Sequence, residues 1–189
     1  MRKKITGFTL IELMITLAIL AILLTIAVPS LRDLMQNNNM IAYSNQLVST
    51  INYARSEAVK RRTRVSVCAM NSDQTDCGSA STPWDDNGWM AFADRVNYGT
   101  YDADDGDNVL DPDEDLLLKV WGDSVNKSDV NITGSAANFV YLQNGFLSGG
   151  AAVGLTVNLV DASVSDQCVR ITNTGRVVTE KIVSGVTCP

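Results

Sequence analysis

One acidic residue within an N-terminal apolar run constrains this chain more than any other feature. Between Phe8 and Val28 the only polar residues are Thr9, Glu12, Thr16 and Thr25. About 20 apolar residues in a helix cross the hydrocarbon core of a bilayer, so the pattern predicts a membrane-spanning helix over residues 8–28. A carboxylate inside such a span costs a few kcal/mol, so Glu12 needs a partner or a purpose.

The charges beside this segment predict its orientation. Arg2, Lys3 and Lys4 precede the apolar run, and residues 29–34 contain no comparable basic cluster. The positive-inside rule therefore places the N-terminus in the cytoplasm. We expect a single-pass protein of the inner membrane whose C-terminal domain lies in the periplasm.

Three interpretations of the apolar segment compete. A cleaved secretory signal is disfavoured, because Glu12 interrupts the apolar core and residues 28–30 form a poor cleavage site. A plain membrane anchor explains the hydrophobicity but leaves Glu12 unexplained. The third interpretation rests on Gly7 followed by Phe8-Thr9-Leu10-Ile11-Glu12, which resembles the class III signal of type IV pilins and type II secretion pseudopilins.

This resemblance implies a defined processing route. A prepilin peptidase would cut after Gly7, removing residues 1–7 as a leader, and Phe8 would become the N-methylated first residue. In that family the acid at the position of Glu12 meets the N-terminal amine of a neighbouring subunit as the helices pack into a filament. Removing one partner of a buried pair costs about 3–5 kcal/mol, so a lone buried acid favours an arrangement that supplies a cation.

The pattern after residue 28 predicts an amphipathic continuation of the helix over residues 29–62, ending at about Lys60. Pro29 also matches the family pattern, and a proline here either kinks the helix or ends it. One apolar stripe is expected to pack on a soluble domain: Leu31, Leu34, Met35, Ile41, Leu47, Ile51, Ala54 and Ala58. Cations gather where they complement the helix dipole: Arg55, Lys60, Arg61, Arg62 and Arg64.

Short β-type runs bounded by turn residues fill residues 63–189 and predict an antiparallel β domain, which makes the fold class α+β. The expected strands are residues 65–70, 89–93, 116–121, 138–142, 155–160, 168–172 and 176–179. Four pieces of sequence resemble the GspH/FimT domain in their order: residues 54–61, 65–68, 88–94 and 114–117. Trp89 and Phe92, within the third piece, are expected to be core residues.

The cysteine and histidine counts limit the chemistry. Four cysteines in an exported domain indicate disulfides with three possible connectivities, of which we favour Cys68 with Cys77 and Cys168 with Cys188. No CxxC spacing suggests zinc. The sequence contains no histidine, which removes the usual nucleophile–base pairs, so we expect no enzymatic activity.

An acidic segment over residues 102–115 raises the question of calcium. Calcium prefers six to eight hard oxygen ligands on a flexible loop, and the ligands would be Asp102, Asp104, Asp107 and Asp111. An EF-hand frame fails, because with Gly106 at its sixth position the first, third and twelfth positions hold no suitable acid. A solvated loop without a cofactor is the favoured interpretation.

The net charge argues against DNA as a partner. Three of the 15 basic residues lie in the leader, so removing it lowers the net charge from −6 to −9. Such a surface repels phosphates. The basic motif of DNA-uptake members of the family begins Gly-Arg with a second Arg two residues on, whereas Gly175-Arg176 is followed by two valines.

The resemblance as a whole implies a minor type IV pilin, nearest to the FimU-like members, that primes assembly and stays near the filament tip. A minor pseudopilin of a type II secretion system shares every feature and is the alternative, and a DNA-uptake pilin is a further one. The implied partners are other minor pilins, the major pilin or pseudopilins, the prepilin peptidase, the inner-membrane assembly platform and membrane lipid. The final location would be a surface pilus or a periplasmic pseudopilus.

Overall fold

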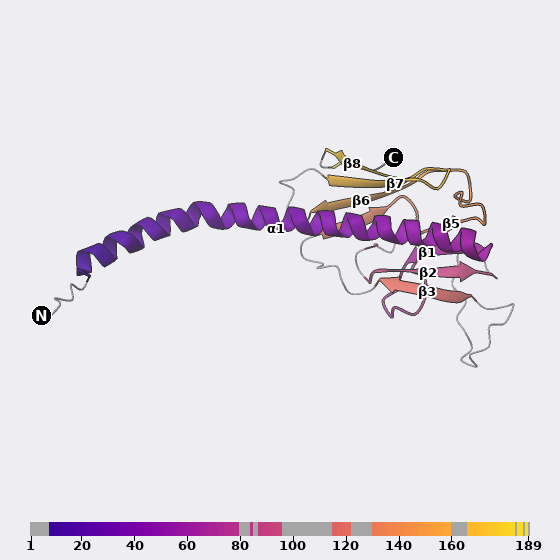
Figure 1. The fold of residues 1–189 in the computed structure, drawn as a ribbon, viewed down its shortest axis with the longest axis horizontal. Helices are drawn as coiled ribbons and strands as arrows, with labels where there is room; N and C mark the ends of the chain where they lie inside the picture. Colours follow the sequence, from indigo (N-terminus) through magenta and orange to yellow (C-terminus); the bar gives the residue numbers. More distant parts are fainter. Residues whose placement is uncertain are drawn as a thin grey trace, which may run out of the picture.

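The chain forms a long helix whose C-terminal half lies on a β domain and whose N-terminal half extends beyond it (Figure 1). The computed structural model describes residues 8–79, 84, 87–95, 115–121, 130–159, 166–183, 185, 186 and 188. Within them, α1 (Leu10–Arg61) is 52 residues long and eight strands follow it. The α+β class predicted from the sequence is therefore confirmed.

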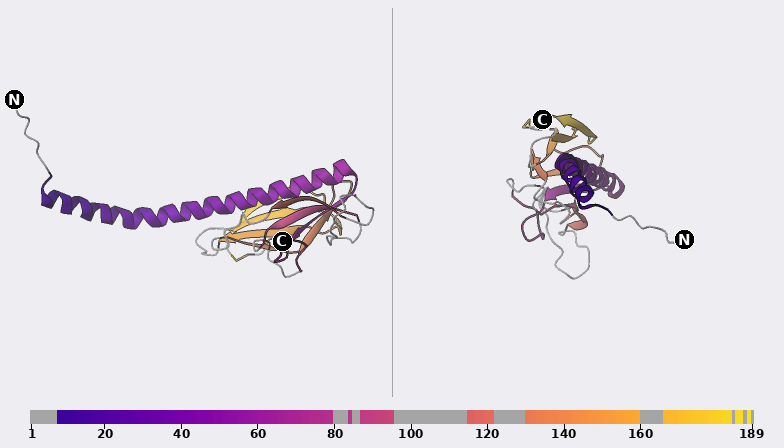
Figure 2. Two further views of the ribbon diagram at one scale, coloured as in Figure 1. Left: turned by 90° about the horizontal axis from the view of Figure 1, so that it is seen from below. Right: turned by 90° about the vertical axis from the view of Figure 1, so that its left-hand side faces the viewer.

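The helix is continuous from its N-cap, Thr9, to its C-cap, Arg62. Pro29 lies inside α1, so it does not end the helix. α1 follows a gentle curve without a sharp break (Figure 2). Arg62 ends the helix in a left-handed conformation, with φ 55° and ψ 36°. That conformation is a common helix stop, because it turns the chain away from the helix axis.

One face of the second half of α1 is buried by the β domain. Burial begins at Gln36 and continues at Met40, Leu47, Ile51 and Ala54, at steps of three, four and seven residues that keep these side chains on one stripe. The expected stripe was partly wrong, because four of its members are exposed: Leu31, Leu34, Met35 and Ile41. Three of these precede Gln36, where the domain first covers the helix, and Ile41 points away from it.

The first sheet has the strand order β3-β2-β1-β5. β1 (Arg64–Ala69) pairs with β2 (Trp89–Asp94) on one side and with β5 (Asn138–Tyr141) on the other. β3 (Leu116–Trp121) pairs with β2 across a register shift and forms one edge. All three pairings are antiparallel.

The second sheet has the order β4-β6-β7-β8 and is also antiparallel. Its strands are β4 (Val130–Gly134), β6 (Val153–Leu159), β7 (Asp166–Ile171) and β8 (Val177–Ile182). α1 contacts strands of both sheets and joins them into one core.

The sequence missed β4 and placed some strand ends wrongly. β4 has five residues and ends in glycine, so it lacks the length and composition of a clear strand. β8 extends to Ile182, beyond the predicted end at residue 179, through Glu180 and Lys181. Charged residues are typical of an exposed edge strand, where they discourage pairing with other chains. The end of β8 was missed because Glu180 and Lys181 are not residues with a high β propensity.

The core lies between α1 and the two sheets. Trp89 and Phe92 are fully buried, as predicted for them, Trp89 in this core and Phe92 in a separate small cluster with Cys68, Met70 and Met90. The Trp89 indole Nε1–H donates to Thr50 Oγ1 of α1 at 2.9 Å, which satisfies both polar groups inside the core. Trp84 is buried as well, and its ring stacks on Phe139 with 5.8 Å between centroids.

Arg55 holds α1 against a turn from each sheet. Its Nε donates to the Gly145 carbonyl oxygen at 3.0 Å, and its Nη2 donates to the Thr174 carbonyl oxygen at 3.2 Å. A Cβ on Gly175, which has φ +76°, would lie 2.1 Å from the Gly145 carbonyl oxygen, so only glycine allows the two turns to approach. The expectation that Arg55 complements the helix terminus therefore missed its main contacts.

Candidate processing and assembly site

Glu12 is held at the start of α1 by its own helix. The Thr9 N–H and the Thr9 hydroxyl donate to Glu12 Oε2 at 3.1 Å and 3.0 Å, and the Glu12 N–H donates to Thr9 Oγ1 at 3.3 Å. This reciprocal arrangement is a capping box, which satisfies N–H groups that lack partners within the helix. The carboxylate thus has a polar partner before any second chain is present.

Sequence reasoning missed Thr9 as the partner of Glu12. The signal was present, because Thr followed three residues later by Glu marks a capping box in front of an apolar run. Phe8, the expected first residue after processing, is 85% exposed and stands immediately before this box. Gly7 lies outside the described residues, so the cleavage point remains a prediction.

The remaining polar groups between residues 8 and 28 are also satisfied within the helix. The Thr16 hydroxyl donates to the Leu13 carbonyl oxygen at 2.8 Å, and the Thr25 hydroxyl donates to the Ile22 carbonyl oxygen at 2.7 Å. In lipid, a polar group without such a partner costs several kcal/mol. This half of α1 therefore suits a hydrocarbon environment despite its threonines.

The apolar half of α1 is not buried by the β domain. Its window of highest hydropathy is wholly exposed, and it is long and apolar enough to cross a membrane. Its large apolar side chains from Leu10 to Val28 are each at least half exposed. A soluble domain rarely leaves so large an apolar surface uncovered, so this surface belongs against lipid or other helices.

A carboxylate and two cations face one another at the C-terminal end of α1. Glu57 is buried and forms ion pairs with Arg61 and Lys60. The hydrogen bond from Arg61 lowers the pKa of Glu57 below its ordinary value, against the opposing effect of burial, and Lys60 lowers it further. The positive charge of Lys60 and Arg61 at the helix end is therefore partly neutralised by Glu57 of the same helix.

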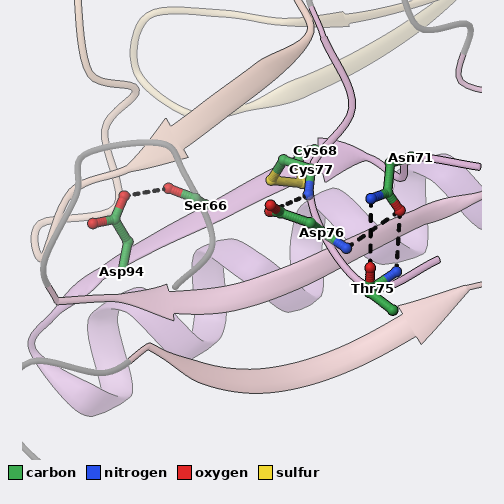
Figure 3. The surroundings of a disulfide bond; sticks show 7 residues. All are labelled: Ser66, Cys68, Asn71, Thr75, Asp76, Cys77 and Asp94. Carbon is green, nitrogen blue, oxygen red and sulfur yellow. Dashed lines mark hydrogen bonds between the residues drawn. A yellow bond between two sulfur atoms is a disulfide. The ribbon is translucent and has the colours of Figure 1, made fainter. Parts of the chain in front are cut away.

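Both disulfides have the pairing favoured from the sequence. Cys68 of β1 bonds to Cys77, nine positions later in the sequence, and closes a loop on the first sheet (Figure 3). Asn71 and Asp76 order this loop, because the Asn71 side chain accepts from the Thr75 N–H at 3.1 Å and the Asp76 carboxylate accepts from the Cys77 N–H at 2.6 Å. Cys168 of β7 bonds to Cys188 and fastens the C-terminal segment.

Asp94 is a buried carboxylate at the end of β2. Ser66 Oγ donates to it at 2.7 Å (Figure 3), and Arg64 Nη2 lies 3.3 Å from its other oxygen. A buried charge with both a hydroxyl donor and a cation is a stable structural arrangement. These contacts join β1 to the end of β2 and help to fix the pairing of the two strands.

The proposed calcium ligands lie outside the described residues, as does most of the acidic segment. Its last acid, Asp115, is buried and accepts the Arg95 N–H at 2.6 Å. Among the described residues, no group of three or more Cys, Asp or Glu side chains could hold a metal ion. The calcium site therefore stays a prediction from the sequence.

Two family models match the chain. The model of the type II transport protein GspH matches residues 44–175, and that of the prokaryotic N-terminal methylation motif matches residues 2–28. The first match covers α1 from Ser44 onward and most of the β domain, and the second covers the apolar half of α1. A search of the curated proteins gives no match.

Two solved structures have similar folds, and both are crystal structures of the type IV minor pilin FimU of Pseudomonas aeruginosa. The first has a TM-score of 0.56 and 15% identity, and the alignment covers 78% of this chain and 92% of that chain. The second has a TM-score of 0.51 and 16% identity, with 74% and 90% covered. At such identities the likeness concerns the fold alone, and that fold is the type IV pilin fold.

Proposed function

Because this chain belongs to the GspH family of pilin and pseudopilin subunits, we propose that it is a FimU-like minor type IV pilin. It joins other minor pilins, primes filament assembly and stays near the tip. The observation that carries this proposal is the combination, in one helix, of a capped acid, an uncovered apolar half and a half buried by the family's β domain. Its work is assembly rather than catalysis.

Processing precedes assembly in this proposal. The prepilin peptidase cuts between Gly7 and Phe8 on the cytoplasmic side, and the new amine of Phe8 is methylated. The match to the N-terminal methylation motif supports this step. The subunit then stays in the inner membrane through residues 8–28, with the β domain in the periplasm.

The capping box suggests how Glu12 behaves before and during assembly. In the free subunit the carboxylate accepts two hydrogen bonds from Thr9, which lowers the cost of placing it in lipid. In the filament the methylated amine of a neighbouring Phe8 offers a full positive charge. Two opposite full charges attract each other strongly in an apolar surrounding, so the acid gains Coulomb energy that the uncharged Thr9 donors do not supply, and this gain favours recruitment.

The partners follow from the same proposal. They are other minor pilins and the major pilin, the assembly platform in the inner membrane, and lipid before extraction. Residues 8–28 supply the surface that packs in the filament, Pro29 allows the gentle curve of α1, and the β domain supplies contacts specific to each neighbour.

The matched family model also supports a second candidate. It describes a type II transport protein, so a GspH-like minor pseudopilin in a periplasmic pseudopilus is the alternative. A DNA-uptake pilin is less well supported, because the mature chain carries a net charge of −9 and the Gly-Arg motif is incomplete at Gly175-Arg176.

Deletion of the gene, followed by two measurements in one strain, separates these candidates. Surface pili are measured by shearing, and type II secretion is measured by the appearance of an exoprotein in the medium. The proposal predicts fewer pili with normal secretion. Normal pili with impaired secretion would identify a pseudopilin instead, and normal pili with normal secretion would favour the third candidate.

A further inference from the structure

An exposed apolar turn follows β8. The Val186 N–H donates to the Val183 carbonyl oxygen at 3.1 Å, and Gly185 has φ +84°, as a tight turn requires. Val183 and Val186 are 76% and 51% exposed. We call Val183, Gly185 and Val186 the β8 turn.

The β8 turn is fixed to the second sheet. The Gly185 N–H donates to the buried Asp166 carboxylate at 3.1 Å. Two residues beyond Val186, Cys188 is bonded to Cys168, and its N–H donates to Thr156 Oγ1 at 3.1 Å. Apolar side chains on a fixed turn lose little conformational entropy when they contact a partner.

The β8 turn lies at the end of the domain that is nearer to the apolar half of α1. β8 starts next to the turn that Arg55 binds near the C-terminal end of α1, and it runs back toward the middle of the helix (Figure 1). Near its end, the exposed Lys181 shares an open groove with residues of α1: Ala27, Ser30, Leu31, Asp33, Leu34 and Asn37. Lys181 therefore lies beside the last turn of the expected span and the turns that follow.

Helix geometry places this groove close to lipid headgroups. The expected span ends at Val28, and the domain first buries α1 at Gln36, eight residues or about 12 Å farther along the axis. The headgroup layer on each side of a bilayer is about 6 Å thick. A tilt of about 20°, usual for a single span, lowers one side of the domain toward that layer.

We propose that Lys181 and the β8 turn form a membrane-contact surface, which rests on anionic phospholipid headgroups while the subunit is anchored by α1. Lys181 attracts the phosphates, and the two valines enter the interface. The net negative charge of the rest of the chain is repelled by an anionic surface, which favours this end facing the membrane. The inference rests on the proposed function, because it requires the span over residues 8–28.

Lipid quenching of tryptophan fluorescence tests this contact in the full mature chain. Val183→Trp and Val186→Trp are made separately and reconstituted in vesicles of phosphatidylcholine and phosphatidylglycerol brominated near the headgroup. Val178→Trp is the matched control, because Val178 is an exposed valine near the other end of the same strand. Quenching above that of the parent protein, which has three tryptophans, is expected for positions 183 and 186 and not for 178.

A charge variant tests the role of Lys181. Lys181→Gln in the Val183→Trp background is expected to reduce the ratio of docked to free domain about five-fold in anionic vesicles, and the reduction should disappear in pure phosphatidylcholine. Equal quenching at positions 178, 183 and 186 would overturn the proposal. Absent quenching at positions 183 and 186, combined with shielding of these positions from solvent in assembled filaments, would also overturn it. That result would assign the β8 turn to a contact between subunits.

Flotation of the same vesicles separates this inference from the proposed function. Protein that floats with the vesicles but shows no quenching at 183 or 186 would contradict the membrane contact alone. Protein that fails to float would contradict the anchor, and the contact with it. Thermal unfolding of each variant shows whether the substitution has left the fold intact, as expected for exposed positions.

Discussion

At the scale of single residues, the acid at the start of α1 has two possible partners over the life of the subunit. The Thr9 groups that hold Glu12 belong to the same turn, so they are available before and after export. Under the proposed function, a second partner is the amine of a processed neighbour, which is available only in the filament. Removing the acid should therefore affect recruitment and leave folding of the distant β domain unchanged.

We predict that Glu12→Ala is processed and folded normally but is recruited poorly into filaments, because the span then lacks the acid that attracts a neighbouring amine. Immunoblots of sheared filaments and of membranes measure recruitment. Asp33→Ala is the control, since it removes an acid of the same helix beyond the expected span. Recruitment of Glu12→Ala at the level of the parent would contradict the prediction.

Gly7 tests the processing step separately. Replacement by a bulky residue should block cleavage and leave the precursor in the membrane, because the bond after Gly7 is the expected scissile bond. N-terminal sequencing and gel mobility measure this. A mature chain beginning at Phe8 in such a variant would show that cleavage does not depend on this glycine.

Arg55 has a different importance, since it donates to two turns that are distant in sequence. Arg55→Ala should lower the free energy of unfolding by about 2 kcal/mol, because it removes two hydrogen bonds from a charged donor. Arg55→Lys can replace one of them and should lose about half as much. Chemical denaturation measures both, and Lys60→Ala, at an exposed position of the same helix, should change stability by less than about 0.5 kcal/mol.

The ion pairs of Glu57 make part of the stability dependent on pH. Because its pKa is lowered in the folded protein, the stabilisation is present above its ordinary pKa of 4.5 and is lost as the pH falls through the lower folded value. Glu57→Gln should therefore be less stable than the parent at pH 7, and the difference should narrow below pH 4.5. A difference that stays constant from pH 7 to pH 3 would show that the charge of Glu57 does not contribute.

At the scale of elements, the sequence predicted those with a strong local pattern. The helix was found because its apolar run and its amphipathic continuation follow a regular period, and β1 and β2 because they are apolar and bounded by turn residues. β4 and the end of β8 were missed because a short strand and a charged edge strand lack that pattern. The Arg55 contacts join residues 90 and 119 positions apart, and a single sequence contains no signal for such pairs.

The exposed positions of α1 show another limit of sequence reasoning. Leu31, Leu34 and Met35 have the spacing of a core stripe, but the domain covers the helix only from Gln36. The spacing of apolar residues alone cannot distinguish a helix face that packs on the same chain from one that contacts lipid or another subunit. The capping box of Thr9 and Glu12, in contrast, could have been predicted from the sequence and was missed.

The two disulfides should differ in importance. Loss of Cys168–Cys188 by a double serine substitution removes a crosslink that spans 20 residues, and we expect a loss of about 3 kcal/mol. The same change at Cys68–Cys77, which spans nine residues, should cost slightly less. Peptide mapping without reduction checks the pairing, and a peptide joining Cys68 to Cys168 or to Cys188 would contradict it.

At the scale of the whole molecule, charge separates the candidate partners. A mature chain with a net charge of −9 should not retard duplex DNA in a gel at physiological salt, because few phosphates can be neutralised. Retardation that weakens steeply as salt is raised would contradict this expectation and favour a role in DNA uptake. Anionic lipid is different, because only the small surface around Lys181 needs to approach it.

The uninterrupted course of α1 also has a mechanical consequence. One backbone passes from the apolar half through Pro29 to the C-cap at Arg62, and the β domain lies along its second half from Gln36 to Ala58. Traction along the helix axis therefore loads that contact in shear, so that many side chains must slip together, whereas a domain attached at one point would peel away. A subunit of this design can be pulled from a bilayer by its helix without losing its folded domain.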